Sequence, residues 1–162
     1  MHTKRVLFKK LNSHHANKKY VNWFDDPIVK KYIFSTKKKI DIISLKKYIS
    51  KNNKNKSTLL FGIFTIDQNE HIGNIKFDDI NIKKNRVIMG ILIGDRNFRG
   101  VGIFNEVIDF FSDYFFNEFK ITNIYLGVDK KNKIAIKSYF KSGFKITSDF
   151  FKEKKLNVFY MV

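Results

Sequence analysis

One abrupt change of pattern constrains the fold of this chain more than any other feature. Residues 87–93 are almost wholly apolar, as a strand buried on both faces is. Beyond the glycine-containing stretch 94–102, apolar residues recur with the period of an amphipathic helix. They are Ile103, Val107, Phe110, Phe111, Tyr114, Phe115 and Phe119. The sequence therefore predicts a buried strand, a glycine turn and a long helix in direct succession.

The segments on either side of this succession predict an α+β protein. Upstream, we expect a strand over residues 5–9, helices over 14–24, 28–32 and 41–50, and strands over 58–66 and 71–77. Downstream, we expect a strand over 121–128, a helix over 132–142, and closing strands over 144–151 and 156–162. This order predicts a mixed central β-sheet flanked by helices. A length of 162 residues is close to the usual size of one domain, so we expect a single domain over residues 1–162.

Composition excludes several classes of site. The chain has no cysteine, which excludes disulfides, thiolate metal sites and a cysteine nucleophile. His14, His15 and His71 show no metal-ligand spacing, so we expect no metal. No apolar run approaches the ~18 residues of a membrane span, and the start lacks a signal-peptide core. We therefore expect a cytoplasmic protein with no membrane partner.

The charge of the chain is strongly positive, at +17 from 32 Lys+Arg against 15 Asp+Glu. Only four of the basic residues are arginines, namely Arg5, Arg86, Arg96 and Arg99. The lysines occur as scattered pairs, and only residues 37–39 form a run. This pattern favours solvated lysine faces over a nucleic-acid interface. A positive surface nevertheless attracts anionic ligands.

The glycine turn has the chemistry of a phosphate site. Glycines permit positive φ, and the first N–H groups of the following helix have no partner within the helix. A Walker A loop is excluded, because Val101-Gly102 follows Gly100 where Lys-Ser/Thr is required. A dinucleotide fingerprint is excluded because its third glycine is absent. An RNA-recognition motif is excluded because Val101 replaces its stacking aromatic residue.

Two motifs together resemble those of the GCN5-related N-acetyltransferase (GNAT) superfamily. Arg99 and Gly102 match its Q/R-x-x-G-x-G/A pyrophosphate loop, and Phe104 stands where that loop ends in a small residue. The second motif is carried, at the family's spacings, by Asn132, Ala135, Tyr139 and Gly143-Phe144. Upstream, residues 23–29 are similar to the W-x-x-D-P-x-V segment of the branch that acetylates ribosomal proteins. The resemblance spans nearly the whole chain.

The resemblance implies a GNAT fold with a splayed strand and a pyrophosphate loop, and acetyl-CoA as co-substrate. Backbone N–H groups would hold the pyrophosphate at Arg99, Gly100, Val101, Gly102, Ile103 and Phe104. The splayed strand at Ile91, Leu92 and Ile93 would pair with the pantetheine arm. Asn132 would hydrogen-bond the cofactor, and Tyr139 would protonate the leaving thiolate. The acetyl group would pass directly to a primary amine.

Several alternatives remain open at this stage. Tyr139 is also compatible with plain core packing, Asn132 with a helix N-cap, and the glycines with a simple turn. Ile88 stands where related enzymes carry a glutamate base, so Asp78 or Asp79, His71 or a water chain would serve instead. A catalytically degenerate CoA-binding or partner-binding module is the alternative function, and a nucleic-acid binder the third.

The acceptor is also open. A protein N-terminus and a nucleotide-linked amino sugar both fit the resemblance, whereas a chain of charge +17 repels a polyamine. The sequence leaves the oligomeric state, including a homodimer, undecided.

Overall fold

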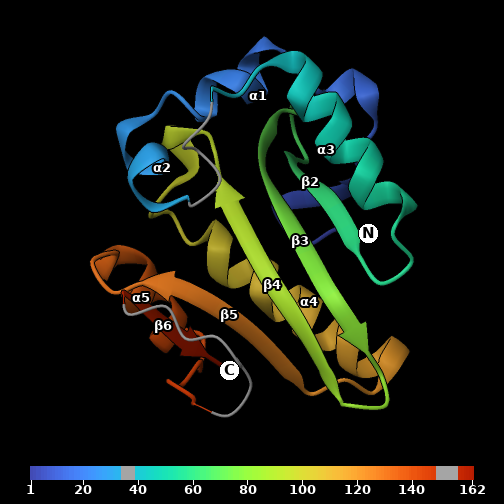
Figure 1. The fold of residues 1–162 in the computed structure, drawn as a ribbon, viewed down its shortest axis with the longest axis vertical. Coiled ribbons are helices and arrows are strands. Elements are labelled where there is room, and N and C mark those ends of the chain that lie inside the picture. The colour runs from blue at the N-terminus through green and yellow to red at the C-terminus, as the bar shows by residue number, and fades with distance from the viewer. Residues whose placement is uncertain (34–38, 149–156) are drawn as a thin grey trace.

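The computed structural model describes residues 1–33, 39–148 and 157–162, and its centre is a six-stranded sheet (Figure 1). The strands follow in the order β1-β2-β3-β4-β5-β6. They are β1 (Val6–Lys10), β2 (Leu59–Thr65), β3 (His71–Asn81), β4 (Arg86–Ile93), β5 (Asn123–Asp129) and β6 (Val158–Met161). β4 and β5 are parallel, and all other neighbours are antiparallel. The sheet is therefore mixed, as expected for the α+β class.

Helices cover both faces of this sheet. They are the 3-10 helices η1 (Ser13–His15) and η3 (Arg96–Phe98), and the α-helices α1 (Lys18–Trp23), α2 (Pro27–Tyr32), α3 (Ile42–Lys54), α4 (Ile103–Phe119) and α5 (Lys133–Lys141). Buried residues of α4 and α5 join one core with the sheet, whereas those of α1 and α3 join a second core. Figure 1 shows α4 behind the strands and α3 in front of them.

The α4 core fixes the two elements on either side of the glycine turn. Phe111 is fully buried, and its ring lies 4.8 Å from Phe77 of β3 and 4.7 Å from Phe8 of β1. Val87 and Met89 of β4 belong to the same core. Burying such side chains is worth about 1.5–3 kcal/mol each. The first half of β4 and the middle of α4 thus belong to one packed core, which holds both elements that the loop joins.

The parallel pair β4–β5 is short, and the two strands then separate. Their register covers only Arg86↔Asn123, Val87↔Ile124 and Ile88↔Tyr125. Beyond this point β5 pairs with β6, from Leu126 to Asp129. Figure 1 shows the two arrows diverging toward the carboxyl end of β4. The expected splayed strand is therefore present.

Four of the expected elements before residue 130 differ from the structure by more than one residue. The helix expected over residues 41–50 continues to Lys54 in α3. The helix expected over residues 14–24 is divided into η1 and α1, because the side chain of Asn17 accepts a hydrogen bond from the Tyr20 N–H and starts a new helix. β3 continues to Asn81 instead of ending at residue 77. β5 begins at Asn123 rather than at residue 121, because the Ile121 N–H still bonds the Phe115 carbonyl of α4.

The two closing strands lie partly outside the described residues. Of the strand expected over 144–151, Ile146 forms an isolated antiparallel bridge with Met161, and residues 149–151 are not described. The last expected strand, over 156–162, corresponds to β6; residue 156 falls outside the described part.

Candidate active site

The loop between β4 and α4 presents unsatisfied backbone N–H groups. Gly100 and Gly102 have φ of 75° and 85°, in the left-handed region that favours glycine. Gly102 is the N-cap of α4 and supplies no side-chain hydrogen bond to the first turn. The first N–H groups of the helix therefore point outward at the positive end of its dipole. A Cβ at Gly100 would meet no atom within 4 Å, so the backbone there is open.

Phe104, which departs from the family's small residue, is turned away from this loop. Its ring packs against the α4 core and meets the ring of Tyr139 edge-on, with 5.1 Å between centroids. The aromatic side chain therefore fills space between α4 and α5, and the backbone of the first turn is not covered by it.

Tyr139 lies between two phenylalanine rings. Besides Phe104, the ring of Phe144 lies 5.8 Å away. Burial raises the pKa of the Tyr139 phenol to about 12. None of the residues that the structure describes hydrogen-bonds its hydroxyl. Tyr139 is thus a protonated phenol on a fixed ring.

Asn132 begins α5 as its N-cap. Its side-chain Oδ1 accepts a hydrogen bond from the Ala135 N–H at 3.2 Å. Asn132 therefore acts as a helix N-cap, which is one of the two roles that the sequence allowed. Its amide Nδ2 group remains available to another partner.

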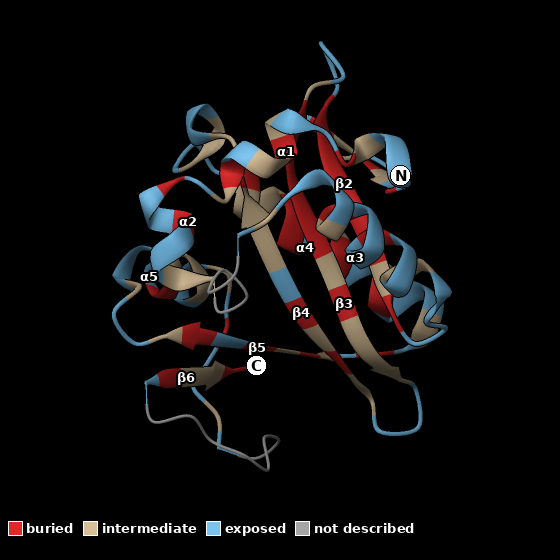
Figure 2. Ribbon diagram, turned by 45° about the horizontal axis from the view of Figure 1, so that its top comes forward, coloured by how far each residue is buried: buried red, intermediate tan, exposed pale blue. Residues whose placement is uncertain are grey.

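The carboxyl half of β4 has an open side. Ile91, Leu92 and Ile93 pair with β3 but lie beyond the last register pair with β5. Gly90, in the middle of this strand, is exposed, and Figure 2 shows it as a pale band on β4. A Cβ at Gly90 would meet no atom within 4 Å. The centre of the sheet is therefore uncovered on the face of α1 and α3.

The comparison with known families agrees with this geometry. A family model described as the Acetyltransferase (GNAT) domain matches residues 5–145. The chain belongs to the GNAT acetyltransferase family. No curated protein sequence matches this chain.

Solved structures share the GNAT fold over nearly their full length. An acetyltransferase of the GNAT family from Bacillus anthracis is 18% identical, with a TM-score of 0.80, and covers 99% of this chain and 95% of its own. RimL, a ribosomal-protein α-N-acetyltransferase in complex with coenzyme A, is 14% identical with a TM-score of 0.82, covering 98% and 93%. Spermidine N-acetyltransferase from Vibrio cholerae, with CoA and spermine, is 20% identical with a TM-score of 0.68, covering 96% and 93%. At these identities the likeness shows the fold.

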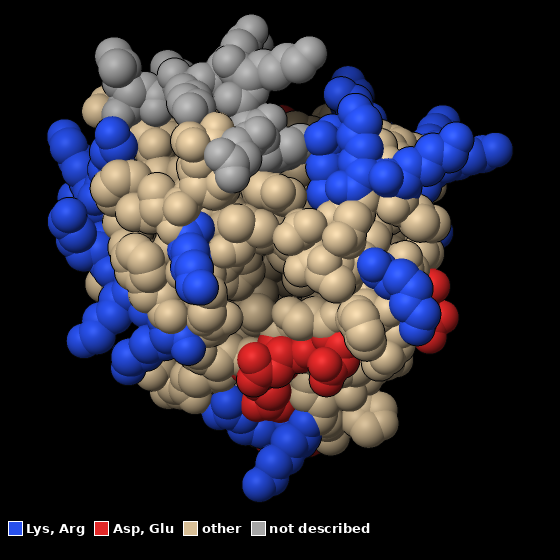
Figure 3. Space-filling view, turned by 90° about the horizontal axis from the view of Figure 1, so that it is seen from below, with Lys and Arg blue, Asp and Glu red and all other residues tan. Residues whose placement is uncertain are grey.

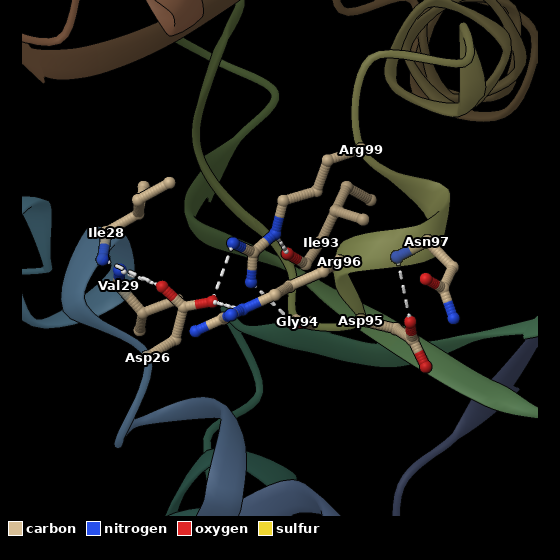
Figure 4. Close-up of polar contacts among 9 residues, drawn as sticks. All are labelled: Asp26, Ile28, Val29, Ile93, Gly94, Asp95, Arg96, Asn97 and Arg99. Atoms are coloured by element: carbon tan, nitrogen blue, oxygen red, sulfur yellow. Dashed lines mark hydrogen bonds and ion pairs between the residues drawn. The ribbon is translucent and has the colours of Figure 1, made fainter.

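In this GNAT domain the side chain of Arg99 is bound within the protein. Its Nε donates to the Ile93 carbonyl at 2.8 Å, its Nη2 to the Gly94 carbonyl at 2.5 Å, and its Nη1 to Asp26 Oδ2 at 2.9 Å (Figure 4). Its guanidinium therefore holds the end of β4, and its backbone N–H, expected to face the pyrophosphate, instead donates to the Arg96 carbonyl at 3.2 Å.

Arg5 also reaches this loop, and sequence reasoning missed it. Its Nη1 donates to the Val101 carbonyl at 2.8 Å, and its Nε pairs with Glu106 at 2.6 Å. Burial alone would raise the pKa of Glu106, but hydrogen bonds from Thr3 and Arg5 lower it. Only the contact itself could have identified Arg5, because it lies 96 residues from Val101.

The three groups considered as the base have different surroundings. His71 is 9% exposed, stacks on Phe64 at 4.6 Å and has a pKa lowered to about 4 by burial. Asp79 is paired with Arg86 at 2.7 Å. Asp78 lies directly opposite Ile88 in the β3–β4 register and therefore shares its face of the sheet.

The surface shows no single basic face in the view from below (Figure 3). There the surface is hollowed near its centre, most Lys and Arg side chains lie toward the edges of the view, and acidic side chains gather below the hollow. Among the described residues, no group of three or more His, Asp or Glu side chains could hold a metal ion. Within the same residues, no helix is long and apolar enough to cross a membrane.

Proposed function

We propose that this protein is an N-acetyltransferase that moves an acetyl group from acetyl-CoA to a primary amine. One observation carries the proposal: the uncapped N-terminus of α4 follows directly on a strand whose second half has no β5 neighbour. Together they offer N–H donors for a pyrophosphate and a free strand edge for an extended arm. The left-handed Gly100 and Gly102 add no side chain of their own to this surface, so the residues present fit coenzyme A.

The proposed binding mode uses the backbone more than side chains. N–H groups from Gly100 to Phe104 hold the pyrophosphate, whereas that of Arg99 donates to the Arg96 carbonyl. Backbone groups of Ile91, Leu92 and Ile93 pair with the pantetheine arm, and one of their N–H groups polarises the thioester carbonyl. The Nδ2 of Asn132 adds a further donor.

Tyr139 serves as the general acid in this proposal. The amine nitrogen attacks the thioester carbon, the new C–N bond forms and the C–S bond breaks. The departing sulfur takes the proton of the Tyr139 hydroxyl. A pKa near 12 means that the phenol carries its proton throughout the neutral range.

Asp78 is the proposed acceptor of the proton that the ammonium must lose before attack. Its side chain is 38% exposed and lies on the same face as the uncovered Gly90. Thr58 donates to its Oδ1 at 3.0 Å, which fixes the carboxylate. His71 is enclosed by aromatic rings. Asp78 pairs with Lys76 at 2.7 Å, as Asp79 does with Arg86, but Asp78 lies on the face of Gly90, so we assign the proton to Asp78 through water above Gly90. A second proton, lost from the tetrahedral adduct, restores the Tyr139 hydroxyl.

The acceptors that we propose are a protein N-terminus or a nucleotide-linked amino sugar. The RimL structure belongs to an enzyme acting on a ribosomal protein, which supports the first. The charge of +17 favours an acceptor carried on an anionic partner. A polyamine, the ligand of the Vibrio cholerae structure, is disfavoured by the same charge.

The test follows the release of free CoA thiol from acetyl-CoA across a panel of amines. The panel contains peptides with free N-termini, amino-sugar nucleotides and polyamines. Amine-dependent release supports the proposal and identifies the acceptor class. Binding of CoA without release for any amine would instead support a module that holds CoA without catalysis. Ile88 favours this alternative, because it stands on β4 where related enzymes carry a glutamate.

A further inference from the structure

The segment from Trp23 to Asp26 contacts the β4–α4 loop at two points. Trp23 ends α1 and is 5% exposed. Its indole lies flat against Gly94, where the position of a Cβ would fall 2.0 Å from Cδ2 of the ring. Asp26, three residues later, is also 5% exposed and pairs with two arginines of the loop.

The two carboxylate oxygens of Asp26 have separate tasks. Oδ1 accepts the Ile28 N–H at 2.7 Å and the Val29 N–H at 3.4 Å, which caps α2. Oδ2 accepts Nε of Arg96 at 2.6 Å and Nη1 of Arg99 at 2.9 Å (Figure 4). One buried carboxylate therefore joins the start of α2 to the loop after β4.

The contact continues through Arg99 to the backbone of β4. The other two nitrogen groups of its guanidinium bind the carbonyls of Ile93 and Gly94. A planar guanidinium with all three sides engaged is fixed in orientation, and a charge-assisted pair with a carboxylate strengthens this. Arg99 thus fixes the direction in which the chain leaves β4 toward Gly100, and Asp26 fixes the orientation of the Arg99 side chain.

Burial makes this carboxylate hard to replace. Removing one partner of a buried ion pair leaves the other charge uncompensated. Without Asp26, two guanidinium groups would remain beside each other with no counter-ion among these contacts. Arg99 would then turn toward solvent and release the carbonyls that it holds.

We propose that Asp26 is a positioning residue that sets the β4–α4 loop for pyrophosphate binding and thereby couples helices α1 and α2 to the coenzyme site. This inference rests on the proposed function, since it assumes that the loop binds the pyrophosphate of CoA. It assigns a physical role to the W-x-x-D segment, whose first and last residues both contact the loop. Asp26 itself touches neither substrate.

The experiment compares Asp26→Asn with Asp25→Asn. Asp25 is the adjacent residue, and its exposed carboxylate pairs with Lys30 on the surface. Trp23 is the only tryptophan of the chain and lies on the loop, so its fluorescence reports CoA binding without a label. We expect the Kd of CoA to rise roughly tenfold in Asp26→Asn and to stay at the wild-type value in Asp25→Asn.

A second readout separates positioning from general damage. S-acetylpantetheine donates the same acetyl group but lacks the pyrophosphate. We expect kcat/KM for acetyl-CoA to fall roughly tenfold in Asp26→Asn, while kcat/KM for S-acetylpantetheine stays at the wild-type value. An equal fall with both donors, or no change with either, would overturn the inference.

Two further outcomes are informative. If wild-type protein binds no CoA, the proposed function fails and the inference with it, whereas wild-type binding with an unaffected Asp26→Asn overturns the inference alone. If Asp26→Asn does not fold, Arg99→Lys replaces it, because lysine keeps the charge but cannot bind both carbonyls and the carboxylate at once. In Arg99→Lys we expect kcat/KM to fall for acetyl-CoA and to stay at the wild-type value for S-acetylpantetheine. If kcat/KM for acetyl-CoA does not fall, the inference is contradicted.

Discussion

The rings of Phe104 and Tyr139 meet edge-on at 5.1 Å, with an angle of 74° between their planes. This contact joins the first turn of α4, where the coenzyme's phosphates are proposed to bind, to the last turn of α5, which carries the proposed acid. The phenol is therefore held at a fixed distance from the loop by a packed aromatic pair. Phe104, which departs from the family's small residue, therefore adds a packing contact to the proposed acid.

Tyr139→Phe should remove catalysis while keeping the packing. The variant retains the ring between Phe104 and Phe144 and loses only the proton that the leaving thiolate needs. We expect kcat to fall about 10²- to 10⁴-fold. Steady-state kinetics with the best amine of the panel measures this change. The Kd of CoA and the melting temperature should stay near the wild-type values, and an unaltered kcat would show that Tyr139 is a packing residue only.

Asp78→Asn should impair proton removal from the acceptor. We expect kcat/KM at neutral pH to fall about 100-fold. Asp79→Asn is the matched control, since asparagine tolerates the φ of 47° there and keeps a side-chain oxygen that can accept from Arg86. Equal rates in the two variants would exclude Asp78 as the base.

His71 should make the fold sensitive to mild acid. Burial is the largest cause and lowers its pKa from 6.5 to about 4. The hydrogen bond with Asn74, next in size, opposes this shift, and the smaller effects of His15 and Lys19 add to it. The unfolded chain then binds a proton between pH 6.5 and 4 that the folded chain does not, so stability falls as pH is lowered through this window. The loss amounts to about 3 kcal/mol when pH reaches 4.

Urea unfolding at several pH values measures this effect. His71→Gln offers a hydrogen-bonding side chain that does not titrate, so its free energy of unfolding should depend less on pH over the same window. Identical slopes for wild type and variant would mean that His71 does not contribute to the acid sensitivity.

Elements with a strong local pattern could be predicted from the sequence. Helix α4 begins at Ile103 and ends at Phe119, as its apolar period indicates. The division between η1 and α1 could not be predicted from that period, because it depends on Asn12 and Asn17 bonding the nearby backbone.

The site was predictable in part for the same reason. The left-handed glycines and the splayed strand follow from local sequence and from the resemblance. The role of the Arg99 side chain could not be predicted in this way. Its partner Asp26 lies 73 residues away in the chain, and only the folded sheet brings the two together. That Asp26 precedes a proline and caps a helix is visible in the sequence, but the partners of its second oxygen are not.

The claim on which the whole account depends is that the β4–α4 loop binds the pyrophosphate of acetyl-CoA. Gly102→Ala tests it against Gly143→Ala. The two glycines have nearly equal φ, 85° and 87°, so alanine adds a similar backbone strain of about 1–2 kcal/mol at each, but Gly143 lies after α5 and outside the loop.

The deciding measurement is the Kd of acetyl-CoA for both variants by calorimetric titration. The account predicts a Kd raised at least about tenfold in Gly102→Ala and unchanged in Gly143→Ala. Equal affinities in the two variants would contradict it.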